Sequence, residues 1–165
     1  MYNVFNFDNL KIPIEQVFEF DEEIKRNAIK LLDTKIEEYT SLHLRLGDKF
    51  LEIQDKKYVL CPNDERVFST NKMEEYIIKN KNKKLLFFCD NQNYKEMINK
   101  KYNNVLITKS KIGHTSFANT SDIQIKDTIT EFYLLTNSKK IIAISRSGFS
   151  IIASKFKNIL YEELF

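Results

Sequence analysis

Short apolar runs alternate with helix-like segments along this chain of 165 residues, and this alternation constrains its fold more than any other feature. Four of the runs predict buried strands, at residues 42–46, 84–89, 104–108 and 140–144. Strands that are apolar on both faces are typical of a parallel sheet covered by helices on both sides. The sequence therefore predicts an α/β protein with a Rossmann-like parallel sheet.

The segments between the apolar runs predict helices. Acidic residues 21–23 open the first helix, because negative charge is favourable at a helix N-terminus, and its apolar stripe extends to Ile36. Asp90 and Asn91 are expected to cap a later helix. Helices are predicted at residues 22–36, 72–79, 91–101 and 121–138, with a last one after the turn at 145–150.

The remaining segments complete the expected organisation. Residues 50–70 are expected to be irregular, and residues 159–161 to form a final edge strand. We divide the chain into residues 1–40, an N-terminal segment with a lead-in helix, and residues 41–165, the Rossmann-like domain.

Composition and motif content exclude several classes of protein. The formal net charge of +3 comes from basic residues spread along the chain, so we expect no binding to nucleic acid. No apolar run is long enough to span a membrane, and the polar N-terminus does not resemble a secretory signal, so we expect a cytoplasmic protein. Cys61 and Cys89 lie at no metal-binding spacing, and neither GxGxxG nor GxxxxGK[ST] is present. We therefore expect no metal cofactor, no dinucleotide oxidoreductase and no P-loop NTPase.

The residues around the end of the first predicted strand carry the clearest chemical signal. His43 and Arg45 lie two positions apart, so on a strand they share a face. An arginine at a strand end is suited to hold an anion, and Gly47 would let the backbone approach a ligand closely. Two alternatives stay open: Arg45 could pair with Asp48, and His43 could be an ordinary core residue.

Two further strand ends carry polar residues. Asp90 follows the run at 84–89, where it either caps the next helix or contacts a ligand. The turn at 145–150 enters a helix whose free N–H groups and serine hydroxyls suit a phosphate, although an ordinary helix cap explains it as well. Because the carboxyl ends of parallel strands meet at one edge of a sheet, we expect these polar clusters to converge on one ligand.

Taken in order, these residues resemble the motifs of an enzyme family. His43-Leu-Arg-Leu-Gly-Asp-Lys49 is similar to the first motif of the fucosyltransferases of the alpha-1,2, alpha-1,6 and protein O-fucosyl superfamily. The apolar strand that ends at Asp90-Asn91 resembles the family's second block. The segment from Glu131 and the strand and turn at 141–150 resemble its third motif.

The resemblance implies the C-terminal, Rossmann-like half of an inverting GT-B glycosyltransferase, with GDP-fucose as its donor and no metal. It implies that Arg45 is the catalytic residue, which grips the diphosphate and stabilises the leaving GDP. It also implies that Glu131 accepts hydrogen bonds from guanine and that His43 lies beside the nucleotide. The other residues implied in substrate binding are Gly47, Asp48, Asp90, Ser145, Ser147, Phe149 and Ser150.

Three departures from the family leave the activity open. The first motif begins at residue 43, so most of the family's acceptor domain, and any catalytic base in it, is not expected in this chain. Three interpretations stay open: a fragment, one part of a split protein whose partner chain supplies the acceptor domain, and a degenerate domain that binds without transfer. Glu131 stands where the family has Asp, and Ile151 and Ile152 replace a Trp pair of the alpha-1,2 branch. The first hypothesis is transfer of fucose to a glycan or protein acceptor. The alternatives are a non-catalytic domain that binds GDP or a nucleotide sugar, and a doubly wound protein for another anionic ligand.

Overall fold

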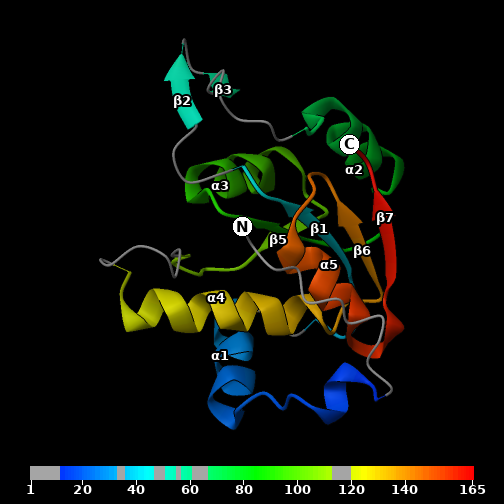
Figure 1. Cartoon of the computed structure of the whole chain (residues 1–165). Coiled ribbons are helices and arrows are strands. Elements are labelled where there is room, and N and C mark those ends of the chain that lie inside the picture. The colour runs from blue at the N-terminus through cyan, green and yellow to red at the C-terminus, as the bar shows by residue number, and fades with distance from the viewer. Residues whose placement is uncertain (1–11, 33–35, 47–50, 55–56, 61–66, 113–119) are drawn as a thin grey trace.

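The computed structural model describes residues 12–32, 36–46, 51–54, 57–60, 67–112 and 120–165. Within these ranges the chain forms a five-stranded sheet flanked by helices, and a separate two-stranded hairpin (Figure 1). In chain order the elements are η2 (Ile14–Gln16), α1 (Glu22–Leu32), β1 (Thr40–Leu44), β2 (Leu51–Gln54), β3 (Lys57–Leu60), α2 (Thr70–Lys79), β4 (Leu85–Cys89), α3 (Gln92–Lys101), β5 (Val105–Ile107), α4 (Asp122–Leu135), β6 (Lys140–Ala143), α5 (Gly148–Lys155), η3 (Phe156–Asn158) and β7 (Leu160–Glu163).

Capping side chains fix where four of the helices begin. Ser69, Asn91, Ser121 and Ser147 each accept a hydrogen bond from a backbone N–H in the first turn of α2, α3, α4 and α5. The first N–H groups of a helix have no partner within it, so each cap is worth about 1 kcal/mol. Asn91 provides the side-chain cap of α3, and the carboxylate of Asp90, which the sequence offers as a second cap, contacts Arg45 and the Leu46 N–H.

The strand order of the sheet is β5-β4-β1-β6-β7, and all four neighbouring pairs are parallel. From β1 the chain builds outward through β4 to β5, and it then crosses back to add β6 and β7 on the other side. The loops after β1 and β6 therefore leave in opposite directions from neighbouring strands. Such a topological switch point leaves a crevice at the carboxyl ends of the strands, which is where open α/β sheets bind ligands.

Helices cover both faces of the sheet (Figure 1). On one face α2 and α3 pack over a core that includes Leu42 and Phe87, and on the other α1, α4 and α5 pack over Phe88 and Ile141. Successive side chains of a strand alternate between faces, so His43 points to the face that carries α5. The predicted Rossmann-like sheet with helices on both faces is confirmed.

Parts of the chain differ from the prediction. β2 and β3 pair as an antiparallel hairpin inside residues 50–70, where the sequence predicts irregular structure. α1 is described as Glu22–Leu32, Ile36 packs against the core without being helical, and α4 ends at Leu135 instead of residue 138. The final edge strand is present as β7. In the part of the chain that the structure describes, no helix is both long and apolar enough to cross a membrane.

Candidate functional site

One serine ties the end of β1 to the end of β6. The Ser145 hydroxyl accepts a hydrogen bond from the backbone N–H of Arg45 at 2.8 Å and lies 3.1 Å from the Arg45 carbonyl oxygen, to which it can donate. Ser145 is fully buried, and its backbone forms an antiparallel bridge with Phe68, which precedes α2. Ser145 therefore fixes the backbone at the switch point, and its hydroxyl is already engaged in doing so.

The Arg45 side chain turns toward the end of β4. Its Nη1 lies 3.1 Å from Oδ2 of Asp90, and the two side chains are 21% and 6% exposed. The other carboxylate oxygen, Oδ1, accepts a hydrogen bond from the Leu46 backbone N–H at 2.7 Å. The alternative pairing of Arg45 with Asp48 lies outside the described residues, because Asp48 is not among them. A permanent positive charge is thus anchored at the carboxyl edge of the sheet.

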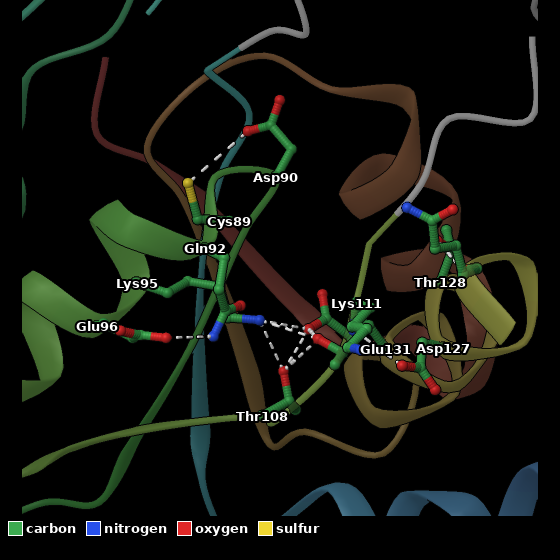
Figure 2. Close-up of polar contacts among 12 residues, drawn as sticks. Cys89, Asp90, Gln92, Lys95, Glu96, Thr108, Lys111, Asp127, Thr128 and Glu131 are labelled. Carbon is green, nitrogen blue, oxygen red and sulfur yellow. Dashed lines mark hydrogen bonds and ion pairs between the residues drawn. The ribbon is translucent and has the colours of Figure 1, made fainter. Parts of the chain in front are cut away.

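Cys89 lies beside the same carboxylate (Figure 2), and its thiol donates to Oδ1 of Asp90 at 3.7 Å. Burial raises the pKa of the Cys89 thiol well above its usual range, and the negative charge of Asp90 acts in the same direction. Because the thiolate is the nucleophilic form of cysteine, a thiol kept neutral in this way is inert. Cys89 is therefore a buried neutral thiol that donates to Asp90.

His43 is a buried ring two residues before Arg45. It stacks on Phe149 of α5, with ring centroids 5.7 Å apart and an angle of 29° between the planes. Burial lowers the pKa of His43 to about 4; the Arg45 charge acts in the same sense, and the Asp90 charge opposes it. No described residue forms a hydrogen bond with its Nδ1. Because buried polar atoms are nearly always hydrogen-bonded, this nitrogen is suited to a ligand atom at the strand edge.

The turn after β6 enters α5 at Ser147. The Ser147 hydroxyl accepts a hydrogen bond from the N–H of Phe149 at 3.3 Å, and the buried Ser150 hydroxyl donates to the Ser147 carbonyl at 3.2 Å. Gly148 is the first residue of the helix, and a Cβ built on it would meet no atom within 4 Å. Gly148 at the start of α5 therefore borders open space, and the N–H groups at a helix N-terminus are of the kind that bind anions.

A second polar cluster lies at the end of β5 (Figure 2). Lys95 of α3 is fully buried, and its Nζ lies 2.9 Å from Oγ1 of Thr108, 3.0 Å from Oγ of Ser110 and 2.8 Å from Oε1 of Glu131 on α4. The two hydroxyls also bond to the same Glu131 oxygen. The cluster is a closed network that joins α3, the end of β5 and α4.

Glu131 therefore lies away from the ends of β1 and β6. β4 lies between β5 and β1, so Thr108 at the end of β5 is two strands from His43, or about 10 Å at the usual strand spacing. Oε1 of Glu131 is taken by the cluster, whereas none of the described residues donates to Oε2. If Glu131 contacts a nucleotide base, Oε2 is the oxygen that accepts the hydrogen bond.

The structure gathers most of the predicted site residues at neighbouring strand ends. Around the ends of β4, β1 and β6 lie His43, Arg45, Asp90, Ser145, Ser147, Phe149 and Ser150. Glu131 belongs to the second cluster, and Gly47 and Asp48 lie outside the described residues. Sequence reasoning missed the partners of Glu131. The signal for them was Lys95, which stands between Tyr94 and Ile98 on the buried side of α3.

Two groups at the strand ends can attract an anion, the Arg45 guanidinium and the N-terminus of α5. Within the described ranges, no group of three or more His, Cys, Asp and Glu side chains is placed to hold a metal ion. The Arg45 guanidinium carries a permanent charge in a fork that matches phosphate oxygens, and the N-terminus of α5 adds the positive end of a helix dipole. Together they can bind a phosphate or diphosphate across the end of β1.

No protein-family model and no curated protein matches the chain. Among solved structures it is similar to a crystal structure of NodZ alpha-1,6-fucosyltransferase soaked with GDP-fucose, at 12% sequence identity and a TM-score of 0.49. The similarity covers 86% of this chain and 43% of that one, so the chain spans less than half the length of the solved protein. A likeness at this level says nothing about the ligand or the reaction of this chain.

Proposed function

We propose that this chain is the nucleotide-sugar-binding domain of a fucosyltransferase-like glycosyltransferase, with GDP-fucose as its donor. One observation carries the proposal: Arg45 and the N-terminus of α5 flank the switch point of a parallel sheet whose strand order places β1 beside β6. Ligands bind at that point in open α/β sheets. The ordered motifs at His43–Lys49, Asp90 and Glu131–Ser150 support GDP-fucose as the ligand.

The diphosphate would lie across the end of β1. Arg45 would contact it from the β4 side, because its guanidinium is anchored there by Asp90. The N–H group of Gly148 and the hydroxyl of Ser147, which already accepts from the Phe149 N–H, would contact it from the β6 side. Gly148 supports this arrangement, since a missing side chain leaves the space that an approaching phosphate needs.

The guanine base would lie on the α5 face of the sheet, beside His43 and toward Glu131. The Nδ1 atom of His43 is one unused hydrogen-bonding position, and Oε2 of Glu131 is a second. A carboxylate oxygen accepts from the N1–H or the amino group of guanine, whereas adenine offers no matching pair of donors. The family motif supports this role for Glu131, whose Oε1 pairs with Lys95.

In the reaction, Arg45 would stabilise the negative charge that develops on the leaving GDP. An inverting transfer without a metal needs such a group, together with an acceptor held in line with the sugar. Positioning the acceptor accounts for roughly 7–11 kcal/mol of such a barrier. We infer that the acceptor site is supplied from outside the described residues. A GDP-release assay with purified chain and GDP-fucose, with and without glycan acceptors, separates a transferase from the non-catalytic alternative.

Calorimetric titration with GDP tests the binding proposal. Arg45→Ala should bind GDP at least about tenfold more weakly than the wild type, since losing a charge-assisted contact to a buried phosphate costs about 2–5 kcal/mol. Arg45→Lys should also bind less well, because lysine lacks the planar fork. Lys101→Ala is the matched control: Lys101 pairs with Glu74 at 2.7 Å on an exposed part of α3. Equal GDP affinity in the wild type and in Arg45→Ala would remove the basis of the proposal.

Gly148→Ala tests the other side of the same site. The new methyl group meets nothing within the chain, and alanine suits the first turn of a helix, so thermal stability should not fall. The affinity for GDP should nevertheless drop if the diphosphate approaches the N-terminus of α5. An unchanged affinity would place the phosphates elsewhere.

A further inference from the structure

Asp90 makes a set of contacts that neither a helix cap nor a phosphate ligand requires. Its Oδ2 lies 3.1 Å from Nη1 of Arg45, and its Oδ1 accepts from the Leu46 N–H at 2.7 Å and from the Cys89 thiol. The helix that follows is capped by Asn91, which accepts from the Tyr94 N–H at 2.9 Å. Both carboxylate oxygens of Asp90 are thus directed at the end of β1.

The charge of Asp90 is unexpected at a site for an anion. A carboxylate repels a diphosphate, and the Asp90 side chain is only 6% exposed, so its negative charge is weakly screened. The same carboxylate holds a flexible arginine in one place. A guanidinium fixed in advance loses less conformational freedom when it binds phosphate than one that is mobile.

We propose that Asp90 is a positioning residue that acts through Arg45: it fixes the guanidinium at the end of β1 in the orientation that receives the diphosphate. The effect on GDP affinity rests on the proposed function, whereas the fixed Arg45 side chain is a property of the chain without ligand. Asp90 then contributes to affinity even though its charge opposes the ligand. Asp90→Asn is the informative substitution, because the amide oxygen still accepts from the Leu46 N–H while the charge that holds Arg45 is lost.

The first measurement needs no ligand. The chain has four arginines, so Arg45→Lys identifies the Arg45 side-chain signals in a ¹⁵N NMR spectrum. In the wild type the Nη signals should be separate, because the ion pair slows rotation of the guanidinium. In Asp90→Asn they should merge, whereas Glu74→Gln, which removes the charge of an exposed pair, should leave them unchanged. Merged Arg45 signals in the wild type would overturn the proposal.

The second measurement is a double-mutant cycle in the affinity for GDP, with NMR titration for the weak variants. Asp90→Asn should weaken binding about fivefold in the wild-type background and less than about twofold in Arg45→Ala, because its effect passes through the arginine. Equal losses in both backgrounds would show a merely structural role, and tighter binding in Asp90→Asn would show a carboxylate that competes with the ligand; either result overturns the proposal. If the wild type binds no GDP, the proposed function fails, and the ligand-free spectra still decide whether Asp90 positions Arg45.

Discussion

Replacing Lys95 with methionine should destabilise the protein strongly, because it leaves a buried carboxylate without its counter-charge. The Lys95 side chain is 0% exposed and that of Glu131 is 4% exposed, with Nζ and Oε1 2.8 Å apart. The cluster joins α3, the end of β5 and α4, so its loss affects both faces of the sheet edge. Methionine has a similar length and fills most of the space that the lysine stem occupies.

The expected loss is about 3 kcal/mol in the free energy of unfolding. Breaking a buried ion pair by removing one partner costs roughly 3–5 kcal/mol. The lower end applies here, because the Thr108 and Ser110 hydroxyls still donate to the Glu131 carboxylate. For a chain of this size, that loss corresponds to a fall in melting temperature of roughly 10 °C.

Urea unfolding followed by circular dichroism measures the effect, with linear extrapolation to water. Lys101→Met is the matched control, because the Lys101–Glu74 pair is exposed and its loss should cost less than about 1 kcal/mol. The double variant Lys95→Met/Glu131→Leu should return to within about 1 kcal/mol of the wild type, since Thr108 and Ser110 still bond to each other at 2.9 Å. A loss in Lys95→Met no larger than in Lys101→Met, or a double variant as unstable as the single one, would refute this reasoning.

The remaining predictions concern pH, base and metal. His43 has a pKa lowered from 6.5 to about 4, so between these values the unfolded chain binds a proton that the folded chain refuses. The contribution of His43 to the free energy of unfolding is therefore complete above pH 6.5 and falls by about 3 kcal/mol as the pH drops to 4. Urea unfolding at several pH values measures this dependence, which should be weaker in His43→Phe. GDP should raise the melting temperature more than ADP or UDP at equal concentration, and Glu131→Gln should narrow that difference; equal shifts with ADP and GDP in the wild type would exclude base reading by Glu131. The affinity for GDP should be unchanged by excess chelator. If chelator weakens GDP binding and Mg²⁺ or Mn²⁺ restores it, Arg45 and α5 do not bind the phosphates without a metal.

The sheet could be predicted because its strands carry their pattern locally. β4 is apolar at every position and buried on both faces, which only a covered sheet satisfies. The ends of the helices were less predictable. After Leu135 the chain has neither the glycine nor the proline that marks many helix ends, so the sequence does not show that α4 stops before residue 138. Ile36 packs against the core without being helical, so its spacing resembles that of a helix residue.

The partners of the charged residues could not be predicted from the sequence, because they depend on strand order. Arg45 and Asp90 are far apart along the chain, and they meet because β4 lies beside β1 in the sheet. Glu131 was identified through a family motif, and nothing local shows that Lys95 lies opposite it across the end of β5. The sequence therefore predicts which charged residues lie at the carboxyl edge of the sheet, but it does not show which of them form ion pairs.

The most direct test of the central claim is a crystal structure of the chain with GDP bound. The account predicts the diphosphate at the end of β1, with its oxygens within hydrogen-bond distance of the Arg45 guanidinium and of the Gly148 backbone N–H or the Ser147 hydroxyl. GDP bound away from the ends of β1 and β6, or a diphosphate at that edge without contact to Arg45, would contradict it.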